Sequence, residues 1–135
     1  MAATLVRPAV GGPREDGGMI DHFGINCADM ERAAAFYDKV LGVLGQRRLM
    51  DFGVAIGYGE ETPDFWISTF EGIGPNREVH VAFAAADQAT ARVVGTESLP
   101  EPRLWPECHP GYFGAFVRDP DGNNVEAVCH TAAPA

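Results

Sequence analysis

Two segments of the chain repeat the same order of signals, and this repeat constrains the fold more than any other feature. IDHFGINC (residues 20–27) and REVHVAFAA (residues 77–85) both alternate apolar and polar residues, as half-buried β-strands do. Each strand carries a histidine on its less apolar face, His22 or His80. Seven residues after each histidine stands an aspartate, Asp29 or Asp87, at the start of a predicted helix. The spacing predicts two related modules within one chain.

The segments that follow predict a strand, a helix and three more strands in each module. In the first module, apolar residues recur at three- and four-residue intervals from Asp29 to Leu44, which is typical of an amphipathic helix. The second helix, DQATARVV, is about two turns shorter. The remaining predicted strands or extended segments are QRRLMDF, GVAIGYG and DFWISTF in the first module and SLPEPRLW, GYFGAFVRD and NNVEAVCH in the second.

These patterns predict an α+β fold in a single domain, residues 19–135, built from modules 19–73 and 77–130. Residues 1–18 mix Gly, Pro and charged residues without a sustained apolar period, so we expect a flexible N-terminal leader there. A length of 135 residues fits one domain of this kind.

Charge and cysteine content narrow the choice of partners and compartment. Ten basic residues against 19 acidic ones give a net charge of −9, the wrong sign for binding nucleic acid or an anionic membrane surface. The sequence has no apolar run long enough to span a bilayer and no export signal at its start. Three widely spaced cysteines favour a reducing cytoplasm.

The last predicted strand places Glu126 in its middle, where a buried carboxylate requires a cation, hydrogen bonds or water. A metal ion bound by His22, His80 and Glu126 would supply that cation. Two imidazoles and one carboxylate suit one divalent ion, Zn, Mn, Fe, Ni or Co. A single histidine in a strand is more often structural, but two at matching points of a repeat favour the metal interpretation.

Three stretches resemble the vicinal oxygen chelate superfamily, which includes glyoxalases, bleomycin resistance proteins and extradiol dioxygenases. They are IDHFGINCADMERAAAFYDKVLG, VHVAF and GYFGAFVRDPDGNNVEAV, within residues 19–130. The resemblance implies paired βαβββ modules whose sheets curl around a metal cup, with His22, His80 and Glu126 as ligands. The place of a fourth ligand falls near Trp66 or Ser68, where a glyoxalase I offers a carboxylate. This departure favours the three-ligand pattern of the extradiol dioxygenases and the fosfomycin-resistance transferases.

Further candidates surround the predicted cup. Glu126 and His109 are the catalytic candidates, although His109 also reads as a turn histidine before Pro110. The predicted substrate pocket contains four aromatic and two amide side chains: Tyr58, Trp66, Trp105, Tyr112, Asn26 and Asn124. Core packing is the alternative role for the aromatic residues.

The sequence thus predicts a metal-dependent enzyme for a small-molecule substrate, with lyase, isomerase or dioxygenase-like chemistry. The alternative is a non-catalytic binding protein for a drug or metabolite, like the bleomycin-resistance members. A third hypothesis is a degenerate member whose short second helix loosens the cup. Because that helix leaves sheet surface uncovered, and because relatives commonly dimerise, we expect a homodimer.

Overall fold

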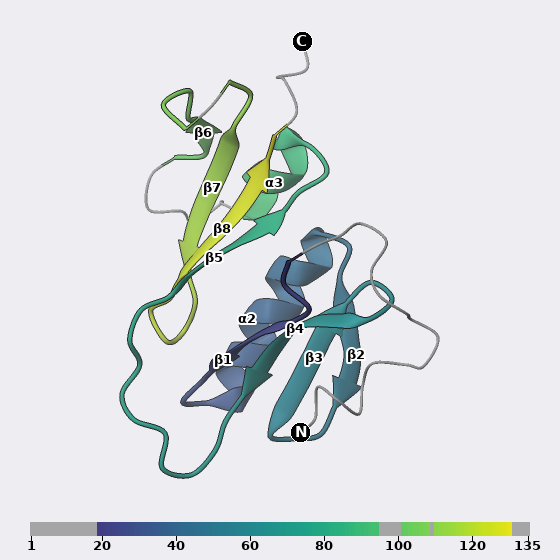
Figure 1. Cartoon of the computed structure of the whole chain (residues 1–135), viewed down its shortest axis with the longest axis vertical. Helices are drawn as coiled ribbons and strands as arrows, with labels where there is room; N and C mark the ends of the chain where they lie inside the picture. The colour runs from purple at the N-terminus through teal and green to yellow at the C-terminus, as the bar shows by residue number, and fades with distance from the viewer. Residues whose placement is uncertain (1–18, 95–100, 109, 131–135) are drawn as a thin grey trace. The chain divides into compact units, whose positions relative to one another are not determined.

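The computed structural model describes residues 19–94, 101–108 and 110–130 (Figure 1). The chain divides into two compact units. The first contains residues up to 41 together with 45–75, and the second contains residues 42–44 together with those from 76 onward. Among the described residues, each unit holds one sheet and one helix.

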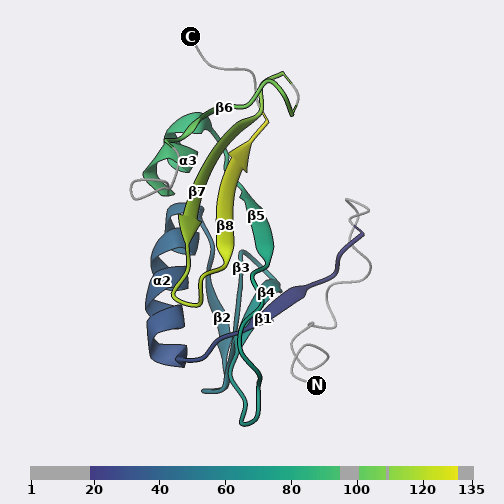
Figure 2. The same ribbon diagram turned by 90° about the vertical axis from the view of Figure 1, so that its left-hand side faces the viewer.

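The first unit is a βαβββ module. Its elements are β1 (Phe23–Asn26), α2 (Met30–Val43), β2 (Arg47–Asp51), β3 (Ala55–Gly59) and β4 (Pro63–Ser68). The strand order is β1-β4-β3-β2, with β1 parallel to β4 and the other pairs antiparallel. Helix α2 lies against one face of this sheet (Figure 2), where Tyr37 packs on Tyr58 and Phe65.

The second unit repeats this topology. Its elements are β5 (His80–Ala84), α3 (Gln88–Val94), β6 (Arg103–Leu104), β7 (Phe113–Arg118) and β8 (Asn124–Cys129). The strand order is β5-β8-β7-β6, with β5 parallel to β8. The predicted α+β class and paired modules are therefore confirmed, and neither four-stranded sheet is closed.

The helices begin where the sequence predicts. The backbone N–H of Arg32 donates to Asp29 Oδ1 at 3.2 Å, and that of Thr90 donates to Asp87 Oδ1 at 2.8 Å. Both aspartates thus act as N-caps at repeat-related positions. Helix α3 has 7 residues against 14 in α2, so the predicted loss of about two turns is confirmed.

Alternation along β7 and β8 separates an apolar face from a polar one. Val125, Ala127 and Cys129 are buried on the face that α3 covers, since α3 contacts β7 and β8. Glu126 and Asn124 belong to the opposite face. Helix α3 therefore does not cover the face of the sheet that carries Glu126 and Asn124.

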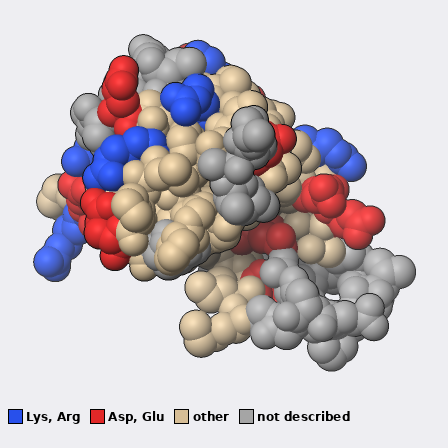
Figure 3. All heavy atoms as spheres, turned by 90° about the horizontal axis from the view of Figure 1, so that it is seen from above, with Lys and Arg blue, Asp and Glu red and all other residues tan. Residues whose placement is uncertain are grey.

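On the face seen in Figure 3, acidic and basic side chains lie interspersed among uncharged ones. No helix within the described residues combines the length and apolar character needed to cross a bilayer.

Candidate functional site

Glu126 lies at the centre of the candidate site, on the polar face of β8. Its side chain is only 2% exposed, yet both carboxylate oxygens are engaged. The Tyr112 hydroxyl donates to Oε2 at 2.5 Å, and His80 Nε2 lies 2.9 Å from Oε1. Gly114 leaves room for this arrangement, because a Cβ there would lie 2.9 Å from Oε2. The carboxylate is therefore held in one position from two sides.

His80 reaches Glu126 through the register of two parallel strands. Residue 82 of β5 pairs with Glu126 of β8, and His80 pairs with Asn124. The His80 side chain is 50% exposed, whereas the carboxylate that it contacts is buried. The imidazole ring is therefore the part of this pair that solvent can reach. Asn124 Nδ2 lies 3.1 Å from His80 Nδ1 and fixes the plane of the ring. Both ring nitrogens thus have partners.

Aromatic side chains line the same face of the second unit. Phe116 pairs with Glu126 across β7 and β8, and its ring meets the His80 ring edge-on at 6.1 Å between centroids. Trp105 packs edge-on against Phe116 at 5.6 Å, and its indole N–H donates to the Gly114 carbonyl. The sequence analysis missed Phe116, although strand alternation places it on the side of Glu126.

Tyr112 is partly buried beside this cluster. Burial, followed by its hydrogen bond to Glu126, raises the pKa of Tyr112 above its usual value. The phenol therefore stays protonated across the neutral range and keeps donating to Glu126.

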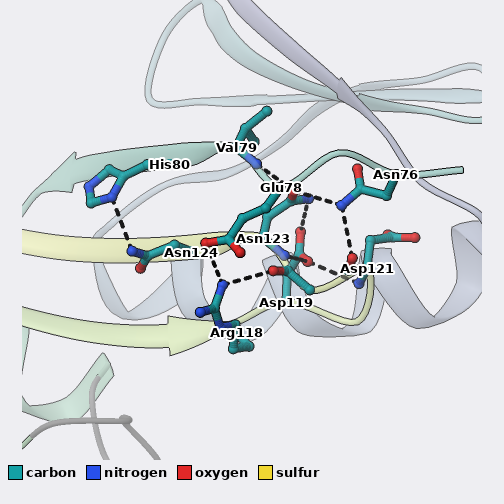
Figure 4. A network of polar contacts seen from close by, with 10 residues as sticks. Asn76, Glu78, Val79, His80, Arg118, Asp119, Asp121, Asn123 and Asn124 are labelled. Carbon is teal, nitrogen blue, oxygen red and sulfur yellow. Dashed lines mark hydrogen bonds and ion pairs between the residues drawn. The ribbon is translucent and has the colours of Figure 1, made fainter.

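The turn before β8 is connected to the strand of His80 by a network of polar contacts (Figure 4). Asn123 is fully buried, and its Oδ1 accepts hydrogen bonds from the Val79 backbone N–H and from Asn76 Nδ2, both at 3.0 Å. Its Nδ2 donates to Asp119 Oδ2 at 2.9 Å. Asn123 thereby links the start of β8 to the residue preceding His80. The sequence analysis did not identify Asn123, and the signal available was an asparagine directly after the glycine of DPDG.

The first unit holds the remaining predicted residues. His22 stands one residue before β1, is exposed, and lies 2.8 Å from the neighbouring Asp21 carboxylate through Nδ1. Asn26 ends β1 as an exposed residue. Trp66 pairs with the residue two positions after His22, just as Glu126 pairs with the residue two positions after His80. The register therefore assigns the repeat counterpart of Glu126 to Trp66 rather than Ser68.

Trp66 is buried against an apolar surface of its own unit. Its ring is stacked with Phe52 at 6.3 Å and covers Gly57, where a Cβ would lie 2.7 Å from the indole. The indole N–H is buried without a hydrogen-bond partner among the described residues. An aromatic group thus occupies the place where the second unit carries a carboxylate.

Tyr58 lies on the other face of the first sheet, away from Trp66. Its hydroxyl donates to Asp38 Oδ1 of α2 at 2.8 Å, and Arg48 also contacts Asp38, at 2.8–2.9 Å. Burial is the main cause that raises the pKa of Tyr58, and the bond to Asp38 adds to it. The structure therefore places Tyr58 in the core beneath α2 rather than with the other pocket candidates.

The second unit thus gathers the candidates His80, Glu126, Tyr112, Asn124 and Trp105 on one side of its sheet. His109 lies outside the described residues. The described residues contain no group of three or more His, Cys, Asp or Glu side chains that could hold a metal ion. His80 and Glu126 form a pair, and His22 belongs to the first unit.

Comparison with known proteins gives one family and a consistent fold. Residues 22–128 match the family model described as a glyoxalase-like domain. No curated protein matches the sequence. A glyoxalase/bleomycin resistance protein from Albidiferax ferrireducens superposes with a TM-score of 0.72 at 22% identity, covering 84% of this chain and 100% of its own.

Two further solved structures agree in fold. A lactoylglutathione lyase from Agrobacterium tumefaciens superposes with a TM-score of 0.61 at 20% identity, covering 86% of this chain and 96% of its own. A glyoxalase/bleomycin resistance protein/dioxygenase family enzyme from Burkholderia phytofirmans gives 0.64 at 12% identity, covering 82% and 98%. At these identities the likeness shows a shared fold.

Proposed function

The chain belongs to the glyoxalase-like domain family, and on that premise we propose that it is a metal-dependent enzyme acting on a small molecule. The proposed ligands of one divalent metal ion are His22, His80 and Glu126. The observation that carries this proposal is the pair formed by His80 and the buried Glu126 carboxylate.

The donor atoms of this pair fit a metal ion. Two ligands at right angles, each about 2.1 Å from one ion, lie about 3 Å apart. His80 Nε2 and Glu126 Oε1 are separated by 2.9 Å, and one imidazole with one carboxylate suits Zn, Mn, Fe, Ni or Co. The support for His22 is its position in the repeat, where it corresponds to His80.

Neighbouring side chains orient Glu126 and line the space beside His80. Tyr112 occupies Oε2 of Glu126, which leaves Oε1 as the oxygen directed toward His80. Phe116 and Trp105 provide an apolar wall beside His80 for the carbon skeleton of a substrate. A bound metal ion would supply Lewis-acid polarisation of substrate oxygens, as lyase, isomerase or dioxygenase-like chemistry requires.

A second candidate function is binding of a drug or metabolite without turnover. The observation that favours it is Trp66, an aromatic side chain at the repeat counterpart of Glu126. Aromatic surfaces retain flat or apolar ligands, whereas a carboxylate there would complete a four-ligand site. Activity assays separate the two functions.

Metal analysis of the purified protein is the first test. We expect the wild type to bind about one zinc or manganese ion per chain, and His80→Ala and Glu126→Gln to reduce this toward zero. His130→Ala is the matched control, since that exposed histidine is not a proposed ligand. Retention of stoichiometric metal by both ligand variants contradicts the proposal.

Activity assays then identify the chemistry. Methylglyoxal–thiol adducts, catechols and epoxides with an acidic group represent the reaction types of the superfamily. Product formation that requires added metal and is lost in Glu126→Gln supports the enzyme. Tight binding without product supports the binding function instead.

Assembly and location complete the proposal. We infer a homodimer, supported by exposed apolar side chains of the first unit such as Phe52, Val54 and Phe70. Light scattering on the purified protein measures its mass in solution. The three widely spaced cysteines suit a cytoplasmic location.

A further inference from the structure

The side chain of Asn124 joins the proposed metal ligand His80 in an arrangement that allows two states. Its Nδ2 lies 3.1 Å from His80 Nδ1, while its Oδ1 is buried without a hydrogen-bond partner among the described residues. An amide nitrogen donates, so Nδ1 of His80 accepts in this state. The ring proton then sits on Nε2 and is donated to Glu126 Oε1 at 2.9 Å.

A metal ion requires the opposite arrangement at His80. The ligand is a neutral imidazole whose bare nitrogen faces the ion, and the other nitrogen donates its proton to an acceptor nearby. With Nε2 as the ligand, the proton of His80 moves to Nδ1. Two donors, Nδ1–H and the Asn124 amino group, would then face each other.

We propose that Asn124 is a positioning residue that sets which ring nitrogen of His80 carries the proton, and that its amide rotates by half a turn when a metal ion binds. This inference rests on the proposed function. The rotation brings Oδ1, the oxygen that lacks a partner, into position to accept from Nδ1–H. Asparagine suits both states because its side chain donates from one end and accepts at the other.

The proposal separates three side chains at position 124 that have the same number of heavy atoms and the same branching. Asparagine supports either position of the proton on His80. Leucine supports neither, because it has no polar atom. Aspartate only accepts at neutral pH, so it favours a proton on Nδ1 at all times.

The test uses ¹⁵N-labelled protein, zinc as the probe, and spectra that show which nitrogen of each histidine carries a proton. The His80 signals are assigned with His80→Gln. In the wild type we expect the proton on Nε2 without zinc and on Nδ1 with zinc. Asn124→Asp is expected to place a proton on Nδ1 already without zinc and to keep its zinc affinity.

Asn124→Leu is expected to bind zinc about 10–100-fold more weakly than the wild type. Gln88→Leu makes the same kind of change in α3, against the opposite face of the sheet, and serves as the control with unchanged zinc affinity. Thermal unfolding of each variant identifies any loss of folding.

The outcomes separate this inference from the proposed function. Zinc binding by the wild type, together with unchanged affinity and unchanged proton position in Asn124→Leu, overturns the role of Asn124 alone. A proton on Nδ1 of His80 in the zinc-free wild type also overturns it alone. Failure of the folded wild type to bind any divalent ion overturns both.

Discussion

Replacing Asn123 by alanine tests whether the turn before β8 holds the candidate site in place. The change removes three hydrogen bonds of the side chain, with the Val79 backbone, Asn76 and Asp119. Each is worth about 1 kcal/mol net, and somewhat more where the partner is charged, so we expect a loss of about 3 kcal/mol in the free energy of unfolding. Position 123 is fully buried, which limits replacement of these bonds by water.

Urea unfolding measures this loss in the second unit. In a Trp66→Phe background, the remaining tryptophan fluorescence comes from Trp105. With a urea dependence of about 2 kcal/mol per molar, the midpoint should fall by about 1.5 M in Asn123→Ala. Asn76→Ala is the comparison, because it removes the two bonds that Asn76 Nδ2 donates, to the Asp121 carbonyl and to Asn123 Oδ1, while Asn123 Oδ1 keeps its bond from the Val79 N–H. It should cost less than Asn123→Ala.

Asn123→Asp sharpens the test at constant volume. It replaces the Nδ2 donor by a carboxylate oxygen that faces Asp119 Oδ2 at a distance of 2.9 Å. Two carboxylates at this distance repel each other when both are ionised. The loss in the free energy of unfolding at pH 7 should therefore match or exceed that of the alanine variant. If both variants unfold within about 1 kcal/mol of the wild type, the assigned role of Asn123 is wrong.

Gly57→Ala should destabilise the first unit by about 1–3 kcal/mol, because the new Cβ would lie 2.7 Å from the Trp66 ring. Gly42→Ala, with nothing within 4 Å of its Cβ, is the control, and equal unfolding midpoints for the two would refute this account of the packing. Burial and the bond to Asp38 raise the pKa of Tyr58 in the folded state, so above pH about 10 the Tyr58 phenol loses its proton in the unfolded chain first. The free energy of unfolding should therefore fall as the pH rises above about 10. Tyr58→Phe should reduce that slope in denaturation measured from pH 8 to 11, and an unchanged slope contradicts the assignment.

The sequence determined the local structure and the repeat. Alternation of apolar residues identified the strands, and Asp29 and Asp87 marked the start of both helices, because these signals depend on neighbouring residues alone. The length of the second helix followed from its short apolar period before Gly95. The polar face that carries Glu126 was predictable for the same reason.

Tertiary structure decided which residues meet. Parallel pairing of β5 with β8 brings His80 to Glu126 across 46 positions of sequence, and no local signal encodes that register. The contact of Asn124 with His80 follows from the same pairing, as does the link from Asn123 to the strand of His80. Tyr112 reaches Glu126 through the antiparallel pairing of β7 with β8.

The aromatic residues show the limit of the sequence most clearly. Tyr58 and Trp66 both belong to strands of the first unit, yet one packs beneath α2 and the other takes the repeat position of Glu126. An aromatic side chain suits a core as well as a pocket, so composition does not separate the two roles. The side of the sheet that the helix covers separates them, and that side is fixed only when α2 docks through Tyr37.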